Sequence, residues 1–252
     1  MTDVHHHTTP QGRRLAYRQL SGAAPGVVFL GGFKSDMTGS KTVSLAEWCG
    51  AQGRGFLRFD YSGHGSSSGA FTDGCIGDWL ADASAIIAAR TVGPQILVGS
   101  SMGGWIALLI ARTNPELVTG LVGIAAAPDF TEDSIWKALT TAQRQELITK
   151  GQIALPSDYD APYIITRRLI DDGRSHLVLR TPLNLPFPVR LLQGTADTDV
   201  PVSTALQLFD HLVSPDARLV LVKGADHRFS TPDCLAMITA AIAGVAQESG
   251  NA

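Results

Sequence analysis

The chain has 252 residues, a formal net charge of -3 and 44% hydrophobic residues. This composition excludes an intrinsically disordered chain, which would have fewer apolar residues and more net charge. The 20 basic and 23 acidic residues form no long runs, so the charge pattern favours neither a nucleic acid nor an anionic membrane as partner. A chain of this length can bury one large core without disulfides or metal, and we expect one domain with an insertion.

The cysteines and the amino-terminal residues bear on where the protein resides. Residues 1–12 are polar and lack the apolar core of a signal peptide, and no apolar stretch is long enough to span a bilayer. The histidines at 5–7 have no fourth ligand nearby and are interpreted as a frayed terminus rather than a metal site. The sequence therefore predicts a cytoplasmic protein without a membrane span. Three widely spaced cysteines without a CxxC pair agree with a reducing compartment: Cys49, Cys75 and Cys234.

Short apolar runs alternate with helical periodicities along the chain. Most of the runs lack alternating polar residues, which is typical of strands covered on both faces. Helical stripes lie at 76–87 and 235–245, and a helix after Pro201 is expected to carry Leu206, Phe209 and Leu212 on its apolar side. This alternation predicts an α/β fold with a mostly parallel sheet and helices on both faces. The predicted strands are 27–30, 56–59, 96–98, 121–124, 189–192 and 219–222.

Residues 129–186 interrupt this alternation. They contain no buried-strand run, and a connection of about sixty residues is too long for a compact α/β fold. We expect a small helical cap inserted over the carboxyl edge of the sheet, where ligands of open α/β sheets bind; the alternative is a peripheral helical excursion. The predicted domains are a core of 1–128 and 187–252 and a cap of 129–186. Within the cap, the pattern is helix-like at 135–150 and 166–173, turn-rich at 155–162 and Pro-rich at 181–188.

The motif that indicates chemistry is Gly-Ser-Ser-Met-Gly at 99–103, a G-x-S-x-G pattern between a predicted strand and an apolar helix. This is the setting of a nucleophile elbow, a sharp turn that exposes a serine above the sheet and needs small flanking residues. Ser101 is the candidate nucleophile, and the Met102 amide at the helix start would donate to an oxyanion. The pattern recurs at 65–69 in a Gly/Ser loop without a following helix, so Ser67 is interpreted as a turn residue.

A serine nucleophile needs a base, and the base needs an orienting acid. His227 follows the last predicted strand, where a loop can bring an imidazole over the elbow. The other histidines after the elbow are His176, in the predicted cap, and His211, inside a predicted helix. From the residues alone, three aspartates compete for the role of the acid: Asp129, Asp197 and Asp199.

The second oxyanion donor is expected after the first predicted strand. There, Gly31 and Gly32 let the backbone approach a reacting carbonyl, and the Phe33 amide would donate. The competing interpretation is a structural turn without a role in catalysis.

These segments resemble the α/β-hydrolase superfamily over roughly residues 13–128 and 187–247. Three runs are similar to the subgroup of the mitochondrial palmitoyl-protein thioesterase that also hydrolyses acyl glucuronides: 31–37 (GGFKSDM), 58–65 (RFDYSGHG) and 99–105 (GSSMGGW). The resemblance implies an α/β-hydrolase fold with an eight-stranded sheet. It also implies a triad of Ser101, Asp197 and His227, because the superfamily pattern Gly-x-x-Asp-x-x-Val-Pro falls on 194–201.

The sequence therefore predicts a serine hydrolase that cleaves small-molecule carboxylic esters or thioesters through an acyl-enzyme, without a metal or organic cofactor. Acyl glucuronides are among the substrates that the resemblance implies. A serine at the elbow argues against the dehalogenases and epoxide hydrolases of this fold, which use an aspartate there. The alternatives are a cofactor-free haloperoxidase, a C–C hydrolase, or a ligand-binding protein with an idle triad.

The predicted cap is rich in basic residues. Most such charges are solvated, but guanidinium groups pair well with carboxylates, and the sugar of an acyl glucuronide bears one. We expect one of three cap arginines to help bind an anionic leaving group: Arg167, Arg168 or Arg174.

Overall fold

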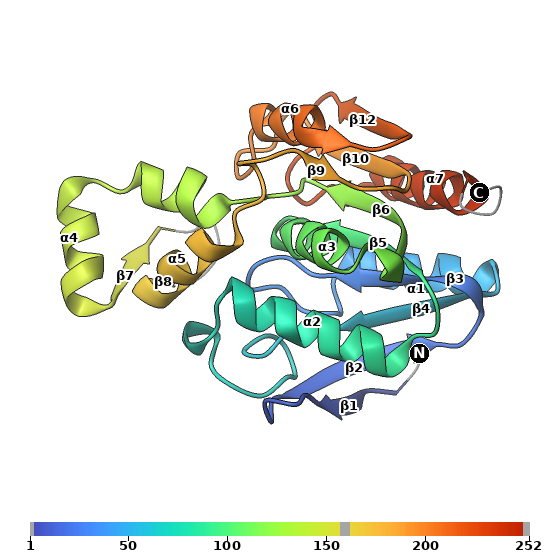
Figure 1. Ribbon diagram of the computed structural model, residues 1–252, viewed down its shortest axis with the longest axis horizontal. Helices are drawn as coiled ribbons and strands as arrows, with labels where there is room; N and C mark the ends of the chain where they lie inside the picture. Colours follow the sequence, from blue (N-terminus) through green and yellow to red (C-terminus); the bar gives the residue numbers. More distant parts are fainter. Residues whose placement is uncertain (1–2, 157–161, 249–252) are drawn as a thin grey trace.

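The computed structural model describes residues 3–156 and 162–248. Within them, an eight-stranded sheet has the order β1-β2-β4-β3-β5-β6-β10-β12 (Figure 1). The strands from β4 to β12 in this order are parallel, and β2 is antiparallel to both of its neighbours. The strands are β1 (His5–Thr8), β2 (Arg14–Leu20), β3 (Ala23–Leu30), β4 (Arg54–Phe59), β5 (Gln95–Ser100), β6 (Val118–Ile124), β10 (Val189–Gly194) and β12 (Ala217–Val222).

Helices cover both faces of the sheet. Helices α1 (Ser40–Ala51) and α7 (Pro232–Glu248) share one buried cluster, while α2 (Ile76–Arg90), α3 (Met102–Thr113) and α6 (Val202–His211) belong to the other. Successive residues of β3 point to opposite faces: Val28 and Leu30 pack with α2 and α3, and Val27 and Phe29 pack with α1 and α7. Because both faces are buried, the strand is apolar without alternation, as the sequence predicted. Among the described helices, none has the length and hydropathy that crossing a bilayer requires.

The structure confirms all six predicted strands and adds two at the amino terminus. The histidines at 5–7, expected to be frayed, form β1 and pair with β2, where His5 lies opposite Tyr17. Their rings are 5.6 Å apart. The expectation was wrong because it considered metal ligands and local pattern, whereas backbone pairing with a distant strand orders this segment.

The predicted apolar side of α6 is also wrong. Ala205 and Leu208 are buried, whereas Leu206 and Phe209 are 51% and 38% exposed. Apolar residues lie around more than one side of this helix, so periodicity alone did not identify the side that packs on the sheet.

The chain leaves the sheet after β6 and returns at β10. In Figure 1, α4, β7, β8 and α5 lie together to the left of the sheet. The helices match the expected helical stretches, but the antiparallel pair of β7 and β8 was not expected. Residues 157–161 of the predicted turn-rich stretch lie outside the described residues. The segment contains a π-helix (Thr131–Trp136), α4 (Thr141–Lys150), β7 (Gln152–Leu155), β8 (Tyr163–Thr166) and α5 (Arg167–Gly173), then η4 (Arg174–His176) and β9 (Leu183–Asn184).

Smaller elements complete the described chain. Beside β9 lies the two-residue strand β11 (Leu212–Val213), and the two pair in parallel. The remaining short elements are η1 (Phe71–Asp73) and η2 (Pro115–Leu117).

Asp129 joins the two ends of the excursion. Its fully buried carboxylate accepts hydrogen bonds from the amides of Val178 and Leu179 at 2.8 and 2.9 Å, and Arg180 lies 3.2 Å away. Burial raises the pKa of this carboxyl above its ordinary value, although the two amides and Arg180 oppose the shift. Since its oxygens hold the chain at 178–180, Asp129 has a structural role and is not the partner of His227.

We expect Asp129→Ala to lower the free energy of unfolding by roughly 2–4 kcal/mol, because it leaves two buried amides without an acceptor. Urea unfolding followed by circular dichroism measures this loss. The matched control is Asp133→Ala, which removes the half-exposed partner of the same arginine and should cost about 0–1 kcal/mol. Equal losses in the two variants would contradict the role of Asp129.

Candidate active site

A strained turn places Ser101 between β5 and α3. Its φ and ψ are 54° and -120°, a conformation that L-residues rarely adopt. A Cβ atom at Gly99 would overlap the carbonyl of Gly103, and one at Gly103 would overlap the carbonyl of Leu30. The two glycines of the motif are therefore required by the close approach of α3 to β5 and β3. This turn holds Ser101 at the carboxyl end of the central strands.

His227 and Asp197 reach Ser101 from two other loops at the same edge of the sheet. The Nε2 atom of His227 is 3.1 Å from the Ser101 Oγ atom, and its Nδ1 atom is 2.8 Å from Asp197 Oδ2. A carboxylate only accepts hydrogen bonds, so Nδ1 carries the proton and Nε2 presents a lone pair to the serine hydroxyl. The three side chains form a continuous hydrogen-bonded line.

The surroundings of Asp197 keep its carboxylate ionised. The side chain has no exposed surface, and this burial by itself would raise its pKa. Hydrogen bonds from His227, the Val200 amide and Gln193, together with the electrostatic attraction of His227, outweigh burial and hold the pKa below its ordinary value. The Asp199 amide donates to Oδ1 at 2.9 Å, and the Gln193 Nε2 donates to Oδ2 at 3.0 Å. The loop thus supplies a fixed negative charge behind the imidazole.

The rival residues are engaged elsewhere. Asp199 is exposed, and its backbone amide donates a hydrogen bond to Asp197 Oδ1. His176 and His211 each bond through Nδ1 to a carbonyl one turn earlier in their own segment. Of the three aspartates that compete from sequence, Asp197 is the one hydrogen-bonded to His227 in the described chain.

Asp197, Asp199 and His227 also have ligand atoms within 4.8 Å of one another, a spacing that a cation could use. Both oxygens of Asp197 accept N–H hydrogen bonds, however, and Nδ1 of His227 points at one of them. These donors occupy the lone pairs that a metal would need, so the arrangement fits a hydrogen-bonded pair better than a metal site.

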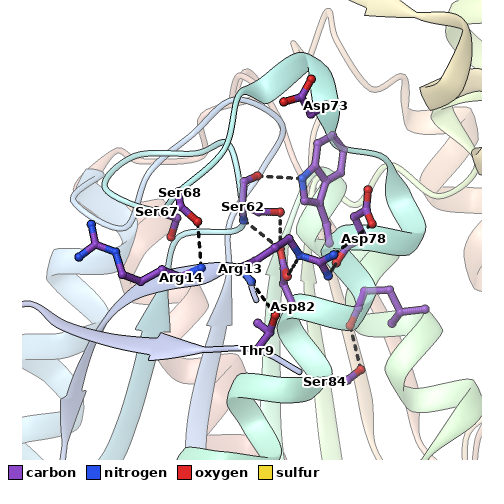
Figure 2. Close-up of polar contacts among 12 residues, drawn as sticks. Thr9, Arg13, Arg14, Ser62, Ser67, Ser68, Asp73, Asp78, Asp82 and Ser84 are labelled. Atoms are coloured by element: carbon purple, nitrogen blue, oxygen red, sulfur yellow. Dashed lines mark hydrogen bonds and ion pairs between the residues drawn. The ribbon is translucent and has the colours of Figure 1, made fainter. Parts of the chain in front are cut away.

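Ser67, the serine of the second G-x-S-x-G pattern, has a structural role. Its hydroxyl donates to the Asp60 carbonyl at 2.7 Å and accepts from the Ala16 amide at 2.8 Å. Its neighbour Ser68 accepts from the Arg14 amide at 2.9 Å, a bond that Figure 2 shows beside Ser67. These bonds tie the loop to β2, which is the turn role expected from the sequence.

The two expected oxyanion donors belong to segments that adjoin Ser101. Met102 begins α3, and Gly32 passes so close that a Cβ atom there would lie 3.4 Å from Ser101 Cβ. Neither the Met102 amide nor the Phe33 amide has a hydrogen-bond acceptor among the described residues. Within the described chain, both N–H groups are therefore free to donate to another group.

A cavity of about 580 Å³ adjoins Ser101 and His227. Residues 129–186 contribute a mainly apolar part of its lining: Phe130, Ile135, Leu155, Pro156, Tyr163 and Ile165. The start of α1 and the loop that holds His227 contribute a polar part: Ser40, Lys41, Thr42, Arg228 and Ser230. The cavity therefore has an apolar side and a polar side, and its charged lining residues are Asp36, Lys41, Asp199 and Arg228.

The structure does not bring the three cap arginines to this cavity. Each pairs with a carboxylate: Arg167 with Asp171 at 3.0 Å, Arg168 with Asp78 at 2.7 Å, and Arg174 with Glu132 at 2.7 Å.

The cations that line the cavity are Lys41 and Arg228, which the sequence analysis missed. Lys41 donates to the Arg228 carbonyl, and burial lowers the pKa of its ammonium group, opposed by Asp226. The sequence could have indicated Arg228, because this residue directly follows His227. Nothing in the sequence pattern indicated Lys41, because only the fold brings the start of α1 to the cavity.

Comparison with known proteins identifies relatives over most of the chain. A family model described as serine aminopeptidase, S33, matches residues 24–171. The palmitoyl-protein thioesterase ABHD10, mitochondrial, of Rattus norvegicus is 41% identical over 221 residues, or 87% of this chain and 74% of the relative. The protein of the same name from Homo sapiens is 38% identical over 221 residues, or 87% of this chain and 72% of the relative.

Solved structures agree with these relatives. A hydrolase from Agrobacterium vitis S4 has a TM-score of 0.92 and 42% identity, covering 98% of this chain and 99% of its own. Alpha/beta hydrolase domain-containing protein 10 from mouse has a TM-score of 0.89 and 37% identity, with 96% and 97% covered. The predicted α/β-hydrolase fold and the resemblance to this subgroup are thereby confirmed.

The cytoplasmic localisation expected from the sequence is wrong. The curated relatives carry names that place them in mitochondria. The expectation rested on the missing apolar core of a secretory signal, which is uninformative here because mitochondrial targeting segments lack such a core as well.

Proposed function

The chain belongs to the serine aminopeptidase S33 family of hydrolases, and from this premise we propose that it is a serine hydrolase with Ser101 as nucleophile, His227 as general base and Asp197 as the orienting acid. Its relatives make it a hydrolase of the esterase and thioesterase type. The observation that carries the proposal is the hydrogen-bonded line from Ser101 through His227 to Asp197, with distances of 3.1 and 2.8 Å.

The proposed reaction has two halves. His227 takes the hydroxyl proton as Ser101 Oγ attacks the acyl carbon, and the amides of Phe33 and Met102 stabilise the negative oxygen of the tetrahedral intermediate. The bond to the leaving alcohol or thiol then breaks, and His227 returns the proton to that group. Water, deprotonated by the same imidazole, attacks the acyl-enzyme and releases the carboxylic acid and the free serine.

The lining of the cavity supports an assignment of its parts. Residues 129–186 act as the cap in this proposal, and their apolar side chains receive the acyl group. An apolar acyl site agrees with the relatives, which are named as palmitoyl-protein thioesterases. Lys41 and Arg228 lie on the other part of the lining, where an anionic leaving group such as a glucuronic acid would gain a charge-assisted contact.

We expect Ser101→Ala to abolish turnover of acyl esters and thioesters and to prevent labelling by a fluorophosphonate, with a loss on the order of 10⁶ in rate. Ser67→Ala is the control from the same motif and should retain both activities. A p-nitrophenyl ester assay and gel fluorescence measure the outcomes. Labelling that survives in Ser101→Ala would exclude this nucleophile, and wild-type turnover no faster than that of Ser101→Ala would favour a ligand-binding protein.

Asp197→Asn should lower kcat by about 10⁴, because an amide favours the wrong tautomer of His227. Asp199→Asn is the matched control two residues away and should change kcat little, since its backbone amide is retained. Steady-state kinetics on one ester substrate decides between them. A larger loss in the Asp199 variant would move the acid to that residue.

Lys41→Met should raise KM for an acyl glucuronide by about 10-fold while leaving a neutral ester of the same acid nearly unchanged, because one charged contact to the sugar carboxylate is lost. Arg167→Met is the control, since Arg167 pairs with Asp171 and does not line the cavity. If both variants affect the two substrates alike, the cavity does not recognise the charge of the leaving group.

A further inference from the structure

His64 is a buried histidine that the proposed reaction leaves without a role. It follows β4 and is 3% exposed. Aromatic rings surround its imidazole, with centroids 5.2 Å away for Phe71 and Trp79 and 5.6 Å for Tyr61. Such a site holds a histidine ring in one orientation, so the partners of its two nitrogens are fixed.

Those partners determine the tautomer of His64. The Nδ1 atom is 3.2 Å from the Ser62 carbonyl, which can only accept, and Nε2 is 3.1 Å from the Lys34 amide, which can only donate. The proton therefore lies on Nδ1, and the lone pair of Nε2 accepts the Lys34 N–H. Only the neutral imidazole satisfies both contacts.

The Lys34 amide adjoins the expected oxyanion donor. The carbonyl of Gly32, which shares a peptide unit with the Phe33 N–H, accepts from the amide and hydroxyl of Ser35 at 3.2 and 2.8 Å. The next peptide unit ends in the Lys34 N–H that bonds to His64. Lys34 has a φ of 60°, a strained value that needs support from its surroundings. Both peptide planes around Phe33 are thus held by hydrogen bonds, and His64 supplies one of them.

His64 is itself held from α2. The Ser62 carbonyl also accepts from Trp79 Nε1 at 3.1 Å, and the Ser62 amide and hydroxyl donate to Asp82 at 2.9 and 2.6 Å (Figure 2). Arg13 pairs with the other oxygen of Asp82 at 2.6 Å. A fully bonded polar network therefore fixes the Ser62 carbonyl, which accepts the hydrogen bond from His64 Nδ1–H.

We propose that His64 is a positioning residue that holds the Phe33 amide toward the oxyanion, and that it does so only as the neutral tautomer with its proton on Nδ1. This role rests on the proposed serine-hydrolase function. His64 would act in the formation of both tetrahedral intermediates. The negative oxygen that the Phe33 amide stabilises exists in those intermediates and not in the bound ester.

Activity would then require two neutral histidines, His227 as the general base and His64 as the acceptor of the Lys34 amide. Among the described residues, ionisable groups near His64 are Lys34, whose backbone amide bonds to the ring, Tyr61 from the end of β4 and Asp82 from α2. Burial lowers the pKa of His64, opposed by its bond to Ser62 and by Asp82. Protonation would place a second N–H against the Lys34 N–H and repel it. Activity is therefore present above this lowered pKa and is lost as pH falls through it.

Two substitutions separate positioning from packing. His64→Phe fills the same space without an acceptor, and we expect kcat to fall by roughly 10-fold or more while KM changes little. His64→Gln keeps an acceptor near the Nε2 position and should recover most of kcat. The control is His176→Phe, which should keep kcat. It also replaces a histidine by phenylalanine, but the His176 ring bonds to the Asp172 carbonyl in the segment at 129–186. Circular dichroism and thermal melting of each variant report whether it is folded.

The pH profile of the folded glutamine variant completes the test. With two histidines that must be neutral, log(kcat/KM) of the wild type should approach an acid-side slope of about 2, and that of His64→Gln a slope of about 1. A slope that stays the same in both proteins, or a folded His64→Phe variant with unchanged kcat, would overturn the proposal. Turnover that survives in Ser101→Ala would instead overturn the proposed function, so the two failures are distinguishable.

Discussion

The close approach of α3 to the sheet is the constraint on which the candidate active site depends. Ser101 adopts a positive φ because the chain must turn at once from β5 into α3, and Gly103 lies against the Leu30 carbonyl with no room for a side chain. The same approach brings the loop after β3 beside the serine, where Gly32 passes Ser101 Cβ. One tight turn therefore places the proposed nucleophile at the start of α3 and beside the loop after β3, the two segments that carry the proposed oxyanion donors.

Two buried carboxylates organise the polar groups around this turn. Asp197 holds His227 directly, and Asp82 holds Ser62, whose carbonyl in turn holds His64. In both cases the histidine carries its proton on Nδ1 and presents the Nε2 lone pair, in one case to a serine hydroxyl and in the other to a backbone amide. Because each carboxylate is satisfied by several donors, the cost of burying its charge is offset and its position is fixed.

The segment at 129–186 shows why the number of charges on an element is a poor guide to its role. Arg167, Arg168 and Arg174 pair with carboxylates outside the cavity, and the fully buried Asp129 joins the ends of the segment. The surface that it turns toward Ser101 is apolar, with Phe130 and Tyr163 among the lining residues. In the proposed function, selection of the acyl group by this segment rests on apolar burial, which is non-directional.

Features that depend on neighbours in the chain were predictable from the sequence: the six central strands, the elbow at Ser101 and the loop that bears His227. They follow from local apolar runs and from glycines that a sharp turn requires. The choice of Asp197 needed the family resemblance, because spacing within a loop does not say which carboxylate meets the imidazole. The pairing of β1, the buried side of α6, and the places of Lys41, His64 and the cap arginines were decided only by the tertiary structure. Each depends on contacts between segments far apart in the sequence, and local pattern holds no information about which distant group will be the partner.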